Sequence, residues 1–130
     1  MLGNGAISWK SKLQSTVTAS TMEAKYIRAN EATREAIWIQ QLLKELKQIF
    51  STIPIQIDNQ SCIALAKNPE YHARSKHIDI QHHFIREQVK KKNVELFYCS
   101  TKEMIADIFT KPLAKKKLEK FKNMMGLVSK

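Results

Sequence analysis

The fold of this chain is decided by residues 53–58, which read Ile-Pro-Ile-Gln-Ile-Asp. Isoleucine recurs at every second position of this stretch, and that period is typical of a β-strand. Pro54 stands near the start of the predicted strand, where a missing amide donor costs least. Asp58 ends the strand, in a setting that suits metal chemistry. Asp58 is therefore the first candidate residue for a functional site.

Helices are predicted on both sides of this strand. Upstream, apolar residues recur at steps of three and four from Ser20 to Phe50, which predicts one long amphipathic helix. Its Ala-rich middle could approach a sheet closely, while its Leu and Phe end would fill a wider gap. Downstream, residues 60–67 read as a short helix that Asn68-Pro69 stops. A second amphipathic helix starts near Lys76 and ends in the lysine run at 90–92. The two stripes consist of Met22, Tyr26, Ala29, Ala32, Ala36, Ile39, Leu43, Leu46 and Phe50, and of Ile78, His82, Ile85 and Val89.

The remaining segments complete an alternating pattern. Residues 6–10 read as a short strand leaving a turn, and residues 94–99 read as another strand. Residues 100–103, Ser-Thr-Lys-Glu, have the spacing of a capping box and predict a helix that Pro112 interrupts. A last helix carries Leu118, Phe121 and Met125 on one face and stops near Gly126. This order of strands and helices predicts an α/β fold in one domain over residues 1–130.

Composition narrows the classes of protein. A chain of 130 residues is large enough to bury one core. Lys and Arg number 22 against 12 Asp and Glu, so the net charge of +10 favours a polyanionic partner such as nucleic acid. Cys62 and Cys99 form neither a CxxC pair nor a disulfide framework, which suits a reducing compartment. The sequence shows no signal peptide and no apolar run of the roughly 18 residues that a membrane span needs, so we expect a soluble intracellular protein.

Three carboxylates are candidate metal ligands: Glu23, Asp58 and Asp107. Each also has an ordinary structural explanation. Glu23 follows Ser20 by three residues and could be the N3 member of a capping box. Asp58 and the next residue, Asn59, could serve a turn. Asp107 is expected in the second turn of its helix, behind Glu103, which already fills the capping role.

Histidines between residues 72 and 83 suggest a zinc site, but their spacing argues against one. Zinc ligands on one helix face lie three or four residues apart, whereas His72, His77 and His82 step by five. A buried histidine with one hydrogen-bond partner is the commoner outcome at His82. The lysine runs at 90–92 and 115–117 are typical of solvated faces.

Taken together, the segments resemble the ribonuclease H domain at the end of the Pol polyprotein of Ty1/copia retrotransposons. The resemblance spans nearly the whole chain, and the combination of motifs is specific in its order and spacing. The residues that carry it are 6–14 (Ala-Ile-Ser-Trp-Lys-Ser-Lys-Leu-Gln), 20–26 (Ser-Thr-Met-Glu-Ala-Lys-Tyr), 35–38 (Glu-Ala-Ile-Trp), 58–61 (Asp-Asn-Gln-Ser), 76–87 (Lys-His-Ile-Asp-Ile-Gln-His-His-Phe-Ile-Arg-Glu) and 106–113 (Ala-Asp-Ile-Phe-Thr-Lys-Pro-Leu).

This resemblance implies a ribonuclease H-like fold, a five-stranded mixed sheet flanked by helices. It also implies hydrolysis of the RNA strand of RNA–DNA hybrids during reverse transcription. Two Mg²⁺ ions, for which Mn²⁺ could substitute, would be held roughly 4 Å apart by Glu23, Asp58 and Asp107. The implied partners are the hybrid and the reverse transcriptase portion of Pol. The implied location is the cytoplasm, in virus-like particles, or the nucleus. The residues expected to contact nucleic acid are Asn59, Gln60, Lys76 and His77.

The sequence departs from the family pattern at its front. The family has a first strand bearing an Asp-Ala-Asp-Trp-like stretch and then a second strand, whereas residues 1–22 contain no Asp or Glu. We therefore expect a domain that is incomplete at its N-terminus and inactive alone. Residues 100–102 also stand where cellular ribonucleases H carry a histidine. Two alternatives stay open: a non-catalytic remnant that binds nucleic acid through charge, and a zinc-binding regulatory module.

Overall fold

The computed structural model describes residues 5–8, 21–49, 51–68 and 76–127, without the side chains of residues 21–22 and 76–82. The chain divides into two compact units. The central unit is Thr16–Cys99, and the terminal unit combines Met1–Ser15 with Ser100–Lys130. Among the described residues, no helix has the length and apolar character needed to span a membrane.

The central unit contains a two-stranded parallel sheet, which confirms the predicted α/β class. Strand β1 (Ile53–Ile57) pairs with β2 (Val94–Tyr98) in register, from Ile53 opposite Val94 to Ile57 opposite Tyr98. The N–H of Ile53 donates to the carbonyl of Asn93 (2.9 Å), and the N–H of Cys99 donates to that of Ile57 (2.9 Å). Because alternate residues of a strand bond to the same neighbour, Pro54 and Gln56 turn their backbone groups to the opposite edge of β1.

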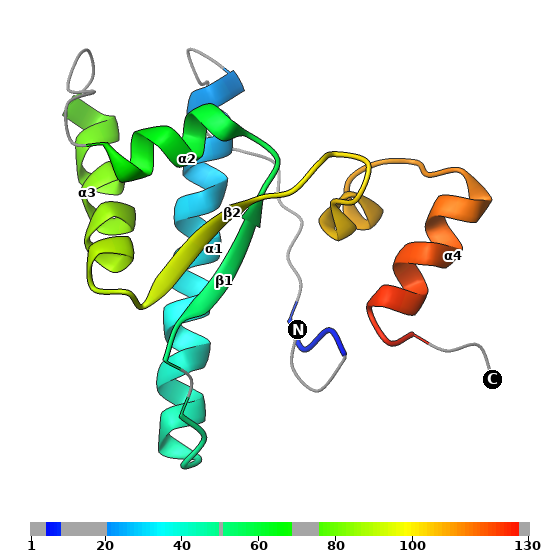
Figure 1. The fold of residues 1–130 in the computed structure, drawn as a ribbon, viewed down its shortest axis with the longest axis horizontal. Helices are drawn as coiled ribbons and strands as arrows, with labels where there is room; N and C mark the ends of the chain where they lie inside the picture. Colours follow the sequence, from blue (N-terminus) through cyan, green and yellow to red (C-terminus); the bar gives the residue numbers. More distant parts are fainter. Residues whose placement is uncertain (1–4, 9–20, 50, 69–75, 128–130) are drawn as a thin grey trace. The chain divides into compact units, whose positions relative to one another are not determined.

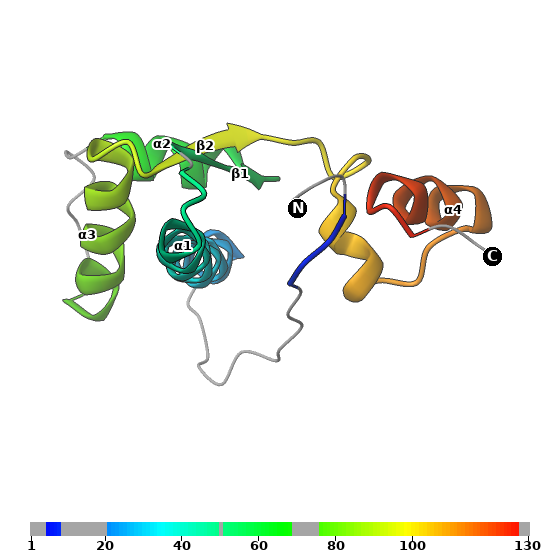
Figure 2. The ribbon, with the colours of Figure 1, turned by 90° about the horizontal axis from the view of Figure 1, so that it is seen from below.

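Helices pack on one face of this sheet. Figure 2 shows α1 (Thr21–Glu45) and α3 (Lys76–Lys90) beneath β1 and β2. The side chains follow the alternation of the strands: Ile57 and Leu96 are buried, whereas Gln56 and Phe97 on the opposite face are exposed. The core of the unit consists of Tyr26, Ala29, Ile57, Cys62, Leu65, Ala66, Ile85 and Leu96.

Local signals fix the ends of the central helices. Helix α2 (Gln60–Lys67) begins at its N-cap Asn59, whose side-chain oxygen accepts from the N–H of Cys62 at 2.9 Å. It ends at Asn68, as predicted. Helix α1 closes with a Schellman motif, in which Lys47 (φ 60°) takes the left-handed position and the N–H of Gln48 donates to Leu43. Helix α3 closes in the same way around Lys92 (φ 58°).

The buried residues of the predicted apolar stripe of α1 lie only in the first half of the helix. Tyr26 and Ala29 are buried, and Ile39 and Leu43 are half-buried. Leu46, just beyond the helix, is 65% exposed, so the expectation that the Leu end fills a gap is wrong at Leu46. Phe50 lies outside the described residues. A helix of 25 residues is about 37 Å long, whereas five-residue strands span about 17 Å. Figure 1 shows the second half of α1 projecting beyond the sheet, where β1 and β2 give it no cover.

The terminal unit is built around α4 (Lys115–Met124). Phe121 and Met125 are buried, and Gly126 (φ 73°) ends the helix, as predicted, whereas Leu118, expected on the same face, is exposed. The strand predicted at residues 6–10 is wrong over Ala6–Ser8, which form no strand; residues 9 and 10 lie outside the described residues. The N–H of Ala6 instead donates to the carbonyl of Met125 at 3.2 Å. A strand needs a neighbour to pair with, and here the bond goes to a helix end.

The helix predicted from a capping box at Ser100 is also wrong. The hydroxyl of Ser100 accepts from the N–H of Lys102 (3.3 Å), and its carbonyl accepts from the N–H of Glu103 (2.8 Å), which closes a turn. A short 3₁₀-helix, η1 (Ile105–Phe109), follows with Met104 as its N-cap. With its hydroxyl used inside the turn, Ser100 caps no helix, and Asp107 lies in the first turn of η1 rather than in a second α-helical turn.

Candidate functional site

Asp58 lies where β1 ends, as the sequence predicts. Since β1 and β2 are parallel, their carboxyl ends meet at the same edge of the sheet. The side chain of Asp58 is 20% exposed, and its Oδ1 accepts from the Lys25 ammonium at 3.0 Å. The side-chain oxygen of the next residue, Asn59, caps the N-terminus of α2. The structural role considered for Asn59 is thus confirmed, and Asp58 remains at the open end of the strand.

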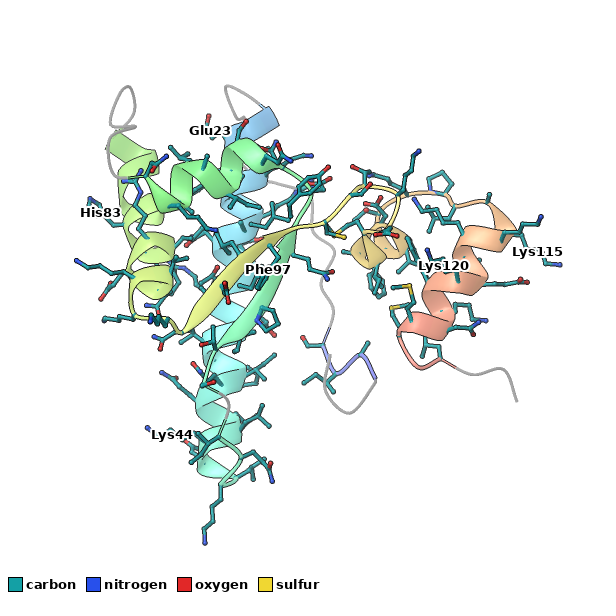
Figure 3. All side chains as sticks on the ribbon, in the orientation of Figure 1. Glu23, Lys44, His83, Phe97, Lys115 and Lys120 are labelled. Atoms are coloured by element: carbon teal, nitrogen blue, oxygen red, sulfur yellow. The ribbon has the colours of Figure 1, made fainter. Side chains whose placement is uncertain are left out.

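Glu23 lies at the same end of the central unit. It belongs to the first turn of α1 and is half-buried, and Figure 3 labels it near the start of that helix. The bond between Lys25 and Asp58 places the start of α1 beside the end of β1. Residues two apart on a helix face different sides, so Glu23 and Lys25 flank the buried stripe that contains Tyr26. The structure therefore brings Glu23 and Asp58 to one end of the unit. Ser20, the proposed capping partner of Glu23, lies outside the described residues.

Asp107 belongs to the terminal unit. Its side chain is 9% exposed, and its Oδ1 accepts from the Lys111 ammonium at 2.9 Å, one helical turn later in the chain. Its carbonyl also accepts from the N–H groups of Thr110 and Lys111. Asp107 is thus a nearly buried carboxylate whose charge is balanced by a lysine.

The residues predicted to contact nucleic acid lie at the starts of two helices. Gln60 is exposed on the first turn of α2, beside Asn59. Lys76 and His77 begin α3, but their side chains lie outside the description, as do those of His72 and His82. Of the histidines, only His83 has a described side chain, and it is exposed.

A buried thiol, Cys62, lies close to the candidate carboxylate, and a buried phenol, Tyr26, lies close to that thiol. Burial raises the pKa of Cys62 to about 11; Lys25 lowers it and Asp58 raises it by smaller amounts. Burial likewise raises the pKa of Tyr26 to about 12 against the opposing charge of Arg86. Arg86 is itself held by two bonds to the carbonyl of Leu65, at 3.2 and 3.1 Å. The thiol and the phenol are therefore uncharged at neutral pH, and the charged groups near them are Lys25, Asp58 and Arg86.

The donor chemistry of these residues suits a magnesium ion. Mg²⁺ prefers carboxylate oxygens and is commonly bound by one or two carboxylates together with substrate phosphates and water. In Asp58 and in Asp107, one carboxylate oxygen already forms an ion pair with a lysine ammonium. Within the ranges that the structure describes, no group of three or more His, Cys, Asp or Glu side chains could hold a metal ion. The carboxylates thus fit the ion in kind and charge, without forming a complete cage.

Two residues that the sequence analysis missed are Lys25 and Lys111. The pair of Asp107 and Lys111 has helical i, i+4 spacing, so it could have been found from the sequence. Asp58 and Lys25 lie 33 residues apart, and no local pattern joins them. Only the packing of α1 against β1 reveals that Lys25 reaches the site.

The fold and the site define a small α/β protein with a carboxylate at the end of a parallel strand. No family model matches the chain, and no solved structure matches it. It is similar to the "Retrovirus-related Pol polyprotein from transposon TNT 1-94" of Nicotiana tabacum, with 45% identity over 125 residues, 96% of this chain and 9% of that protein. Polyproteins from transposons RE2 and RE1 of Arabidopsis thaliana share 38% and 39% identity over 98% and 97% of this chain, again covering 9% of each relative.

The homologues of this chain are therefore Pol polyproteins of Ty1/copia-type transposons, and the similarity covers nearly the whole chain. The chain is thus similar to a short region of such polyproteins. The chain spans about 9% of the length of these relatives.

Proposed function

We propose that this chain is the ribonuclease H region of a retrotransposon Pol polyprotein. The reaction would be metal-dependent hydrolysis of the RNA strand of RNA–DNA hybrids. The observation that carries the proposal is the position of Glu23 and Asp58 at one end of the central unit, with the Asp58 carboxylate at the end of a parallel strand. The similarity to Pol polyproteins along 96% of the chain supports the same origin.

Glu23, Asp58 and Asp107 would hold Mg²⁺ in this reaction. The bound ions would supply an activated water and stabilise the leaving oxygen. The carboxylates contribute position and negative charge, and the buried apolar residues beneath Asp58, among them Cys62, keep its strand end in place. Since Mg²⁺ commonly takes part of its ligands from substrate phosphates, the protein need not enclose the ion by itself.

The hybrid would bind through polar and basic side chains near this end. Gln60 is exposed at the start of α2 and would contact the sugar-phosphate backbone together with Asn59, Lys76 and His77. The excess of 22 basic over 12 acidic residues would draw the polyanion to the protein. The reverse transcriptase portion of Pol is the proposed partner, because the hybrid is its product, and the cytoplasm, in virus-like particles, or the nucleus is the proposed location.

The test is cleavage of a labelled RNA–DNA hybrid in Mg²⁺ and in Mn²⁺, by the chain as given and by a longer Pol segment that contains it. We expect cleavage by the longer segment and its loss in Asp58→Asn. The matched control is Glu95→Gln, which removes an exposed carboxylate from the neighbouring strand β2 and should leave cleavage unchanged. Cleavage that survives Asp58→Asn, or that is absent from the longer segment, would show that the proposal is wrong.

A second candidate function is metal-independent binding of nucleic acid by a non-catalytic remnant. The absence of any acidic residue from residues 1–22, together with the net charge of +10, favours it. Such a binder should lose affinity steeply as salt rises, without any requirement for a divalent ion. Binding of the hybrid that is equal in EDTA and in Mg²⁺, with no cleavage by either version of the protein, would support this alternative over the enzyme.

A further inference from the structure

Two lysines lie on the two candidate aspartates in almost the same way. The Lys25 ammonium lies 3.0 Å from Oδ1 of Asp58, and the Lys111 ammonium lies 2.9 Å from Oδ1 of Asp107. The first pair joins α1 to the end of β1, whereas the second spans one turn beside η1. The same arrangement has therefore been built twice from different local structures, one in each unit.

The carboxylate is the more buried partner in each pair. Asp58 is 20% exposed against 30% for Lys25, and Asp107 is 9% exposed against 50% for Lys111. Ion pairs that stay this close to water contribute little to folding stability. A nearly buried carboxylate nevertheless needs a counter-charge, because its charged form is costly away from water. The lysines supply that counter-charge while their ammonium groups remain near the surface.

We propose that Lys25 and Lys111 are internal counter-cations that compete with a divalent metal ion for Asp58 and Asp107. This inference rests on the proposed function, since it concerns the same carboxylates. A metal ion ligated by the same oxygen would bring two positive charges next to the ammonium group, and the two would repel each other. Each lysine therefore holds its aspartate in the metal-free protein and must swing away when the ion binds. Both are positioning residues that act through the aspartates.

The test is Mn²⁺ binding to the full 130-residue chain, measured by electron paramagnetic resonance of the free ion. Lys25→Met keeps the apolar stem and removes the charge, and so does Lys111→Met. Because the competing ion pair is worth at most about 1 kcal/mol, each substitution should tighten Mn²⁺ binding by about three- to fivefold. Lys25→Arg, which keeps the charge, should bind as the unsubstituted chain does.

Two controls separate this effect from general changes of charge or folding. Lys44→Met removes an exposed lysine from the last turn of α1, and Figure 3 labels Lys44 far along the helix from Glu23. It should leave Mn²⁺ affinity unchanged. Far-UV circular dichroism should give the same spectrum for all variants. The gain from Lys25→Met should also vanish in the double variant with Asp58→Asn, because the two residues act on one oxygen.

The outcomes also distinguish this inference from the proposed function. Unchanged Mn²⁺ affinity in both Lys25→Met and Lys111→Met would overturn the inference, and so would the absence of Mn²⁺ binding in every variant. Tighter binding in these variants, with no cleavage of the hybrid by the longer Pol segment, would support the counter-cation role and contradict the ribonuclease activity.

Discussion

The two halves of α1 have opposite surroundings. In the first half, Tyr26 is 1% exposed and Thr33 is fully buried, and the helix contacts α3 and β1. In the second half, Trp38 is 58% exposed and Leu42 is 42% exposed. Both halves carry apolar residues at helical spacing, so the pattern of the sequence does not distinguish them. The difference comes from the partner: a five-residue sheet covers only part of a 25-residue helix.

The substitution that separates the halves most strongly is Tyr26→Ala. We expect it to lower the free energy of unfolding by about 3–5 kcal/mol, because it empties a filled position in the core. Trp38→Ala, the matched change in the exposed half, should cost less than about 1 kcal/mol. Urea denaturation followed by circular dichroism measures both. Equal losses in the two variants would mean that Trp38 is covered in solution.

The second-largest effect is expected at alkaline pH, which should lower the free energy of unfolding through two buried groups of the core, Tyr26 in the packed half of α1 and Cys62 in α2. The pKa of Cys62 is raised from 9.0 to about 11 and that of Tyr26 from 10.0 to about 12, in both cases mainly by burial. Because the folded protein keeps these protons longer than the unfolded chain does, their contribution is complete below pH 9 and falls as the pH rises toward 11 and 12. Between pH 7.5 and pH 10 we expect a loss of about 2 kcal/mol.

Urea denaturation at both pH values checks this loss. Cys62→Ala should remove most of the difference, because the thiol begins to titrate first. A free energy of unfolding that stays constant from pH 7.5 to pH 10 in the unsubstituted chain would contradict the assigned directions.

The smallest expected effect is a gain at the end of the exposed half. Lys47 occupies the left-handed position that closes α1, where a side chain is unfavourable and glycine is not. Lys47→Gly should therefore raise the free energy of unfolding by about 0.5–1 kcal/mol. Lys44→Gly, three residues earlier and inside the helix, should lower it by about 1 kcal/mol. Thermal unfolding of the two variants gives the comparison; a shift in the same direction for both would contradict the left-handed assignment.

Most of the central unit could be predicted because its signals are local. The alternation at residues 53–57 predicts the strand, and the pair Asn68-Pro69 predicts the end of α2. The errors arose where the outcome depends on distant residues. Ala6–Ser8 form no strand, since pairing needs a neighbour, and Leu46 is exposed, since burial needs a covering element. At Ser100 the hydroxyl accepts a hydrogen bond within a local turn instead of capping a helix.

In the candidate site, too, local patterns predict some features, whereas others depend on packing between distant residues. The position of Asp58 follows from the strand period, and that of Glu23 follows from the start of the helix. The link between them through Lys25 depends on packing across 33 residues, which no periodicity encodes. For Asp107 the sequence predicts an α-helix where the structure has a 3₁₀-helix, although the pairing with Lys111 depends only on spacing.

Pro54 has a consequence for how copies of this chain behave at high concentration. Its backbone faces the edge of β1 that points away from β2, and proline offers no N–H there. An incoming strand from another molecule would find one donor missing from that edge, which discourages edge-to-edge aggregation. Pro54→Val would restore the donor and add a residue that favours strands. Pro54, which alternates with the isoleucines of β1, is therefore expected to help keep the protein dispersed.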